Sequence, residues 1–194
     1  ADGALRIEPA GELTRLRLNP RGGQHVPLPR DTEISLPGVQ GNTLELEFEM
    51  EAPTTPSVGI KLLASPEDEE RTLITFDLMA KTVRIDLSQS SLSPDVFYPW
   101  PHPWSAHHPM GGPWNKESVL EQIAPLDLRQ DETLKVRLFL DRSILEIYIN
   151  GRQCMTQRIY PTRADSRRLT LFSKGDDARV LSWNAWDMAP SNAW

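Results

Sequence analysis

Apolar and polar residues alternate along most of this chain, and the alternation is strictest from Thr43 to Glu51. In that segment, TLELEFEME, every second residue is Leu, Phe or Met, and the residues between them are Glu. A period of two places successive side chains on opposite faces of a β-strand. The segment therefore predicts a strand with one buried apolar face and one solvated acidic face.

The same period recurs in shorter segments, which predict further strands. They are 58–63, 72–78, 82–87, 134–140, 144–149, 153–160, 168–173 and 178–187, with one more strand near 4–18. Short polar turns between the first three predict a meander. Only Lys116–Ile123 could form two turns of helix. This pattern predicts an all-β fold of one domain, residues 1–194, built as a two-sheet antiparallel β-sandwich of the concanavalin-like jelly-roll type.

Composition limits the partners that such a domain can take. The formal net charge of −6 leaves no basic stripe for phosphates, so we expect neither nucleic acid nor a membrane surface as partner. The single cysteine, Cys154, excludes an internal disulfide and a cysteine-rich zinc site. The chain starts without Met, a basic leader or an apolar segment, which predicts a mature or excised fragment with no targeting peptide.

The segment from Leu134 to Pro161 has the pattern of a β-hairpin but carries more charge than a hairpin needs. Asn-Gly between two alternating runs is a strong turn signal. A three-residue turn at 150–152, with Gly151 at positive φ, would keep Met155 and Ile159 on the buried face. A two-residue turn would instead bury Arg158, which would be costly for a charged group.

On the three-residue register, five side chains share the outer face of this hairpin: Glu146, Tyr148, Thr156, Arg158 and Tyr160. Glu146 and Arg158 become diagonal neighbours, close enough for an ion pair. Two interpretations stay open. The pair is either a salt bridge on the sheet surface, or part of a sugar site in which Glu146 accepts and Arg158 donates hydrogen bonds. Asp141, which ends the preceding strand, is a further candidate for that site.

A loop rich in Trp, His and Pro interrupts the strands at about residues 97–115. Its five prolines are incompatible with a central strand, and a loop of this length is often functional. Trp100, Trp104 and Trp114 offer flat indole faces that suit the apolar face of a sugar ring. The alternative is that these tryptophans pack the loop over a sheet.

Motifs for catalysis or metal binding are missing from the sequence. His102, His107 and His108 lack a spacing that would aim them at one ion. Nucleophile elbows, phosphate-binding glycine loops and zinc-helix motifs do not occur, and nothing marks two carboxylates as a catalytic pair. We therefore predict no catalytic residue, no metal and no cofactor.

The hairpin and the segment DSRRLTLFSKGDDARVLSWNAWDM together resemble the C-terminal β-sandwich domain of glycoside hydrolase family 32, the β-fructosidases that include invertases, levanases and inulinases. The matching motifs are D-R-S-x-x-E-x-Y-x-N-G at 141–151, R-x-Y-P at 158–161, LF at 171–172 and AW at 185–186. The Trp/His/Pro loop departs from the family pattern by its length.

This resemblance implies a non-catalytic accessory domain of a β-fructosidase-type glycoside hydrolase. In that family the catalytic carboxylates belong to N-D-P, R-D-P and E-C motifs of a separate N-terminal propeller, and none of these motifs occurs here. The implied partners are that propeller and a fructose-containing carbohydrate such as fructose, levan or inulin, as in the similar family-66 carbohydrate-binding modules. A purely structural role, between domains or in oligomerisation, is the alternative. The substrate class favours an extracellular or periplasmic location.

Overall fold

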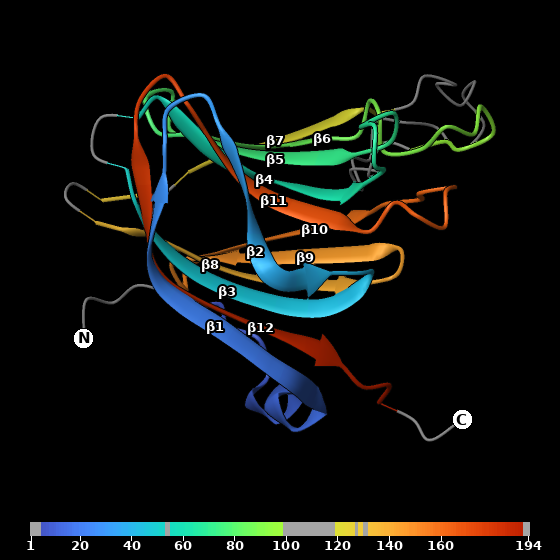
Figure 1. Ribbon diagram of the computed structural model, residues 1–194, viewed down its shortest axis with the longest axis horizontal. Helices are drawn as coiled ribbons and strands as arrows, with labels where there is room; N and C mark the ends of the chain where they lie inside the picture. Colours follow the sequence, from blue (N-terminus) through green and yellow to red (C-terminus); the bar gives the residue numbers. More distant parts are fainter. Residues whose placement is uncertain (1–4, 53–54, 99–118, 127, 130–131, 192–194) are drawn as a thin grey trace, which may run out of the picture.

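The computed structural model describes residues 5–52, 55–98, 119–126, 128–129 and 132–191. Two antiparallel sheets of six strands each form two layers (Figure 1), which confirms the predicted all-β sandwich. Sheet A has the order β1-β12-β3-β8-β9-β10, and sheet B has the order β2-β11-β4-β5-β6-β7.

The strands of each sheet come from both halves of the chain. Sheet A consists of β1 (Arg17–Leu28), β3 (Thr43–Glu51), β8 (Leu134–Asp141), β9 (Ile144–Ile149), β10 (Gln153–Arg158) and β12 (Ala178–Met188). Sheet B consists of β2 (Glu33–Gln40), β4 (Ser57–Ala64), β5 (Thr72–Asp77), β6 (Thr82–Asp86), β7 (Glu121–Pro125) and β11 (Arg168–Lys174). Among the described residues the one helix is the 3-10 helix η1 (Gly11–Leu16).

The core lies between the two sheets and is made of the apolar side chains that the alternating pattern predicts. Two rows of fully buried residues, each in register across three neighbouring strands, mark its centre: Leu46, Leu138 and Ile147 in sheet A, and Ile60, Ile74 and Ile85 in sheet B. Removing such side chains from water is the main stabilising contribution to a sandwich of this kind.

Nine of the predicted strands are present, and β3 and β9 have the predicted bounds. The meander is confirmed as β4-β5-β6 in sheet B. The prediction of a strand near 4–18 is wrong for most of the residues that are described there, because η1 occupies Gly11–Leu16 and β1 begins only at Arg17. No residue of η1 is buried, so this segment has no apolar face to place in a sheet.

The possibility of a helix at Lys116–Ile123 is also wrong for the described residues of that segment, because β7 pairs with β6 from Glu121 onward. Strands β1, β2 and β7 were not predicted as such. Of the Trp/His/Pro loop, only Phe97 and Tyr98 belong to the described part, and the rest of it lies outside the described residues.

The β9–β10 turn has the predicted three residues, because Gln153 pairs with Ile149. Asn150 and Gly151 have φ of 48° and 62°, the left-handed region that favours Gly and tolerates Asn. The Asn150 side chain accepts a hydrogen bond from the Lys135 backbone N–H (3.0 Å) and donates one to the Thr133 carbonyl (2.8 Å). The register therefore places Glu146 and Arg158 on the outer face, as expected.

Candidate functional site

The outer face of sheet A carries ordered rows of polar and aromatic side chains, because each strand contributes every second residue to that face. One row runs across five strands and consists of Asn184, Glu47, Arg137, Tyr148 and Cys154. The next row consists of Trp186, Glu45, Phe139, Glu146 and Thr156. Neighbours within a row lie about 5 Å apart at their Cβ atoms, so they can act on one ligand together.

Glu45 lies at the centre of this face and is fully buried, so the expectation of a solvated acidic face is wrong there. Its Oε1 is 2.6 Å from Arg17 Nη2 and 2.7 Å from Arg137 Nε. The Arg17 guanidinium also stacks on the ring of Trp186, 3.7 Å from its centroid, and covers the carboxylate from solvent. Burial acts to raise the pKa of Glu45, but the hydrogen bonds from the two arginines outweigh it and hold the pKa below its ordinary value.

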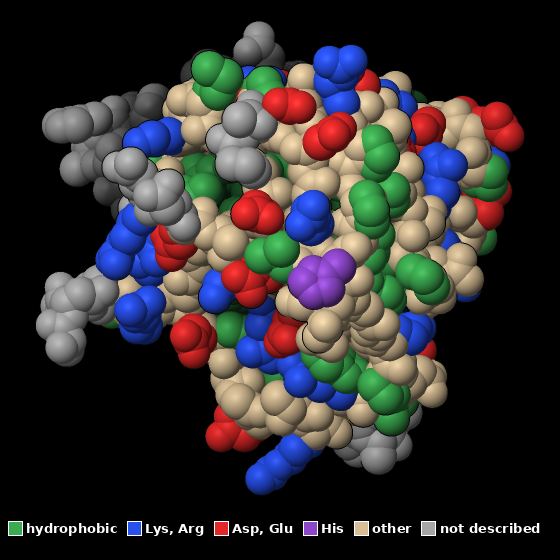
Figure 2. All heavy atoms as spheres, turned by 60° about the vertical axis from the view of Figure 1, so that its left-hand side comes forward, with side chains coloured by type: hydrophobic (Ala, Val, Ile, Leu, Met, Phe, Trp, Pro, Cys, Tyr) green, Lys and Arg blue, Asp and Glu red, His purple; other side chains and the backbone are tan. Residues whose placement is uncertain are grey.

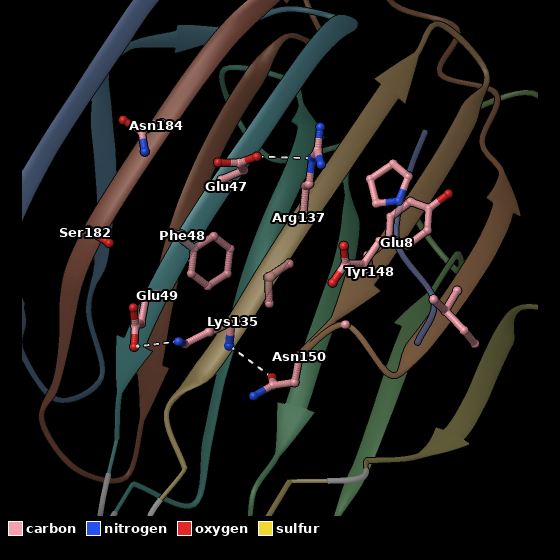
Figure 3. A pocket seen from close by; sticks show the side chains of 14 residues that line it. Glu8, Glu47, Phe48, Glu49, Lys135, Arg137, Tyr148, Asn150, Ser182 and Asn184 are labelled. Carbon is pink, nitrogen blue, oxygen red and sulfur yellow. Dashed lines mark hydrogen bonds and ion pairs between the residues drawn. The ribbon is translucent and has the colours of Figure 1, made fainter. Parts of the chain in front are cut away.

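A groove of about 390 Å³ lies beside these ion pairs (Figure 3). Seven polar side chains from the strands of the sheet line it: Glu47, Glu49, Lys135, Arg137, Tyr148, Ser182 and Asn184. Ile7, Glu8 and Pro9, which precede η1, line it from another side. Polar groups held on paired strands around a concave surface are typical of a small-ligand site.

Several of these groups have hydrogen-bonding capacity that the protein leaves unused. The side chains of Ser182 and Asn184 make no hydrogen bond within the described structure, although both line the groove. The Tyr148 hydroxyl donates a hydrogen bond to the Glu146 carboxylate that is long, at 3.4 Å. Burial, with the charge of Glu146, raises the pKa of Tyr148 to about 12, so the hydroxyl remains a donor at neutral pH. This arrangement suits a neutral ligand with many hydroxyl groups.

The residues predicted for a sugar site are only partly brought together. Glu146 and Arg158 share a face as expected, with Glu146 opposite Thr156 and Arg158 opposite Ile144. No ion pair joins them, contrary to expectation, because the Glu146 carboxylate lies toward the Tyr148 hydroxyl and Arg158 extends into solvent.

The other predicted residues lie farther from the groove. Tyr160 follows the end of β10 and stacks on buried Tyr98 with ring centroids 5.9 Å apart, so it does not join the Glu146 face. Asp141 is exposed at the end of β8. Trp100, Trp104 and Trp114 lie outside the described residues, as do the three histidines of the loop. Tyr148 is the one predicted ligand that lines the groove.

Sequence reasoning missed Arg137, Ser182 and Asn184. Their outward direction follows from the alternation in β8 and β12, but their proximity depends on β3 lying between those two strands. The pairing of Glu47 with both Asn184 and Arg137 is a property of the sheet order, and no local pattern encodes it.

Within the described ranges, no group of three or more His, Cys, Asp or Glu side chains could hold a metal ion. The part of the chain that is described also has no helix long and apolar enough to cross a membrane. On the face shown in Figure 2, acidic and basic side chains are interspersed and neither sign forms a continuous stripe.

Comparison with known proteins connects this fold to one family. Residues 12–187 match the family model described as glycosyl hydrolases family 32 C terminal. Raffinose invertase from Escherichia coli is 38% identical over 71 residues, which cover 36% of this chain and 15% of that protein. The insoluble isoenzyme 7 of beta-fructofuranosidase from Oryza sativa subsp. indica is 28% identical over 141 residues, covering 68% of this chain and 20% of that protein.

Two solved structures have the same fold over nearly the whole chain. Fructan 1-exohydrolase IIa from Cichorium intybus has a TM-score of 0.75 at 17% identity, covering 96% of this chain and 38% of that one. Exo-inulinase from Aspergillus awamori has a TM-score of 0.69 at 17% identity, covering 96% and 32%. The chain thus spans a fifth or less of the two curated relatives. By the match over residues 12–187, this β-sandwich belongs to the C-terminal domain family of the family 32 glycosyl hydrolases.

Proposed function

We propose that this chain is a non-catalytic accessory domain of a β-fructosidase and that it binds fructose-containing carbohydrate, such as fructose, levan or inulin, on the outer face of sheet A. The observation that carries the proposal is the polar groove, in which side chains with unused hydrogen-bonding capacity are fixed on paired strands. The names of the relatives, an invertase, a fructan exohydrolase and an exo-inulinase, support fructosyl units as the ligand class.

Recognition in this groove would rest on complementary donors and acceptors. Tyr148 donates a hydrogen bond, the Asn184 amide can both donate and accept, and Glu47 accepts. Asn184 and Glu47 are opposite each other in register, so two strands can contact neighbouring hydroxyl groups of one sugar ring. Glu146 and Arg158 lie on the same face beyond Tyr148 and would contact a longer oligosaccharide. Asp141, Tyr160 and the loop residues Trp100, Trp104 and Trp114 stay candidate contacts in this proposal.

Calorimetric titration with 1-kestose, levan and inulin tests the proposal. Tyr148→Phe and Asn184→Ala each remove a hydrogen-bonding group that could contact the ligand, and each should weaken binding by roughly 2-fold to 10-fold. Asn42→Ala, at an exposed position that does not line the groove, is the matched control for Asn184→Ala and should leave the dissociation constant unchanged. A wild-type chain that releases no heat at millimolar concentrations of all three ligands would contradict the proposal.

A structural role is the second candidate function. It is supported by the small share of its relatives that the chain spans, because a domain of this kind would lie next to a larger catalytic part. This role predicts that removing residues 1–194 from the parent enzyme lowers its melting temperature or changes its oligomeric state. If soluble expression, melting temperature and oligomeric state all stay unchanged, the structural role is excluded.

A further inference from the structure

The segment that precedes β1 crosses the outer face of sheet A. It ends at Arg17, where β1 starts at one edge of the sheet. Near its other end, the Ile7 backbone N–H donates a hydrogen bond to the Gly151 carbonyl in the β9–β10 turn, at 2.9 Å. Strands β12, β3 and β8 lie between β1 and β9, so the segment spans four strand spacings, roughly 19 Å.

This segment leaves a hollow between itself and the sheet. Helix η1, which forms the part nearest β1, buries none of its residues. Ile7, Glu8 and Pro9 line the groove of about 390 Å³ together with the side chains of β3, β8, β9 and β12. Figure 3 shows the Glu8 side chain over the same part of the groove as Tyr148, with Arg137 nearby on β8.

Gly151 makes the close approach of Glu8 possible. A Cβ atom at residue 151 would lie 3.1 Å from Glu8 Oε1, tighter than nine in ten real Cβ contacts, so the Glu8 side chain would have to shift by a few tenths of an ångström. The glycine of the Asn-Gly turn therefore serves two purposes, because it adopts φ of +62° and also leaves room for the Glu8 carboxylate.

We infer that Ile7–Pro9 is a strap that completes the carbohydrate groove and that Glu8 is a specificity-determining ligand residue at its open side. This inference rests on the proposed function and deepens it. The strap adds a carboxylate acceptor to the groove that the donors Tyr148 and Asn184 also line, so that one sugar ring can contact the strap and the sheet together. Within the described residues, the backbone hydrogen bond from Ile7 to Gly151 holds the strap beside the β9–β10 turn.

Two pairs of variants of the full chain test the strap, with 1-kestose as the probe. Ile7→Pro removes the N–H that donates to Gly151, whereas Ala10→Pro is its control, since Ala10 already has φ of −56°. Glu8→Gln removes the carboxylate in the groove, whereas Glu12→Gln changes an exposed carboxylate on η1 that does not line it. We expect the dissociation constant to rise about 5-fold in Ile7→Pro and Glu8→Gln and to stay within 2-fold in both controls.

The outcomes separate the strap from the groove itself. If all four variants bind 1-kestose as the wild type does, the strap inference is overturned and the proposed function stands. Equal weakening in a variant and its control also overturns it, because the effect would then be general. If the wild type binds no ligand, the proposed function fails and the strap inference with it. Melting temperatures within about 2 °C of the wild type confirm that every variant is folded.

Discussion

Glu45 shows how a charged residue in an alternating strand can become part of the interior. Its side chain points to the outer face of sheet A, where Arg17, Arg137 and the ring of Trp186 enclose it. Removing one partner from a buried set of charges leaves the other charges without a partner. The resulting loss of folding stability is typically larger than the net stability that the whole set contributes. This carboxylate should therefore matter far more for stability than its neighbours in the same strand.

We expect Glu45→Ala to lower the free energy of unfolding by about 3 kcal/mol, because two arginines lose their shared partner. Urea denaturation of the wild type and variant measures this difference. Glu51→Ala is the control, because Glu51 is exposed in the same strand, and it should change the value by less than about 0.5 kcal/mol. Equal effects of the two substitutions would show that the buried position of Glu45 carries no special weight.

The alternation in TLELEFEME correctly predicts the direction of the Glu45 side chain but not its burial. Burial depends on Arg17 and Arg137, which are 28 and 92 residues away in the sequence and are brought close by strand order. The same limit applies to the groove, since Tyr148 was identifiable from the hairpin while Asn184 was not.

Glu70 is a second fully buried carboxylate, and it connects three loops without a cation bound to it in the described structure. Its oxygens accept hydrogen bonds from the backbone N–H groups of Leu92, Thr162 and Arg163 and from the hydroxyls of Thr162 and Ser166. Burial acts to raise the pKa of Glu70, but these donors outweigh it and hold the pKa below its ordinary value.

A depressed carboxyl pKa stabilises the fold at pH values above the unfolded pKa of about 4.3, and that contribution is lost as the pH falls through the folded value. We therefore expect the unfolding free energy of the wild type to decline below about pH 4.5. In Glu70→Gln the fold should be less stable at pH 7, and the decline between pH 5 and pH 3 should be shallower. Glu67→Gln, at an exposed position in the same loop, should follow the wild-type profile. Parallel profiles for all three chains, from urea titrations at each pH, would contradict this assignment.

At the scale of elements, the strands that the sequence did not reveal are sheet edges. Strands β1, β2 and β7 occupy three of the four edges of the sandwich. Each contains proline, which interrupts the alternating pattern and is tolerated where one side of a strand has no partner. The central strands have partners on both sides and an apolar face, so their period of two is preserved and could be recognised.

The Asn-Gly signal of the β9–β10 turn can be tested by substituting its glycine. Gly151→Ala introduces a side chain at φ of +62° and close to Glu8, so it should destabilise the fold by about 1 kcal/mol and lower the melting temperature by roughly 2–4 °C. Gly11→Ala is the control, because its φ is not in the left-handed region and no atom lies within 4 Å of its added Cβ. Scanning calorimetry should find the control unchanged. A melting temperature of Gly151→Ala equal to that of the wild type would show that the turn accommodates a side chain.

At the scale of the whole molecule, the two residues that flank segment 99–118, Tyr98 and Val119, are held together by the sandwich. The Val119 backbone N–H donates to the Tyr98 carbonyl at 2.8 Å. The Tyr98 ring stacks on Tyr160, and its hydroxyl is 2.6 Å from Ser90 Oγ. The prolines in the sequence predict a loop without regular strands. The position of Tyr98, where this loop begins, depends on its contact with Tyr160, which is distant in the sequence and could not be predicted from the loop itself.

In a β-turn the carbonyl of the first residue accepts a hydrogen bond from the N–H of the fourth, with two residues between them. The hydrogen bond from the Val119 N–H to the Tyr98 carbonyl joins the same two kinds of group, so a two-residue connection could replace the segment between them. Replacing residues 99–118 with Asn-Gly should therefore preserve the fold, with a melting temperature within about 3 °C of the wild type. The variant should still bind 1-kestose, because the described lining of the groove comes from β3, β8, β9, β12 and the strap. Calorimetric titration and scanning calorimetry of the same preparation check both expectations. A folded variant that no longer binds would assign the essential sugar contacts to Trp100, Trp104 or Trp114 instead of the groove.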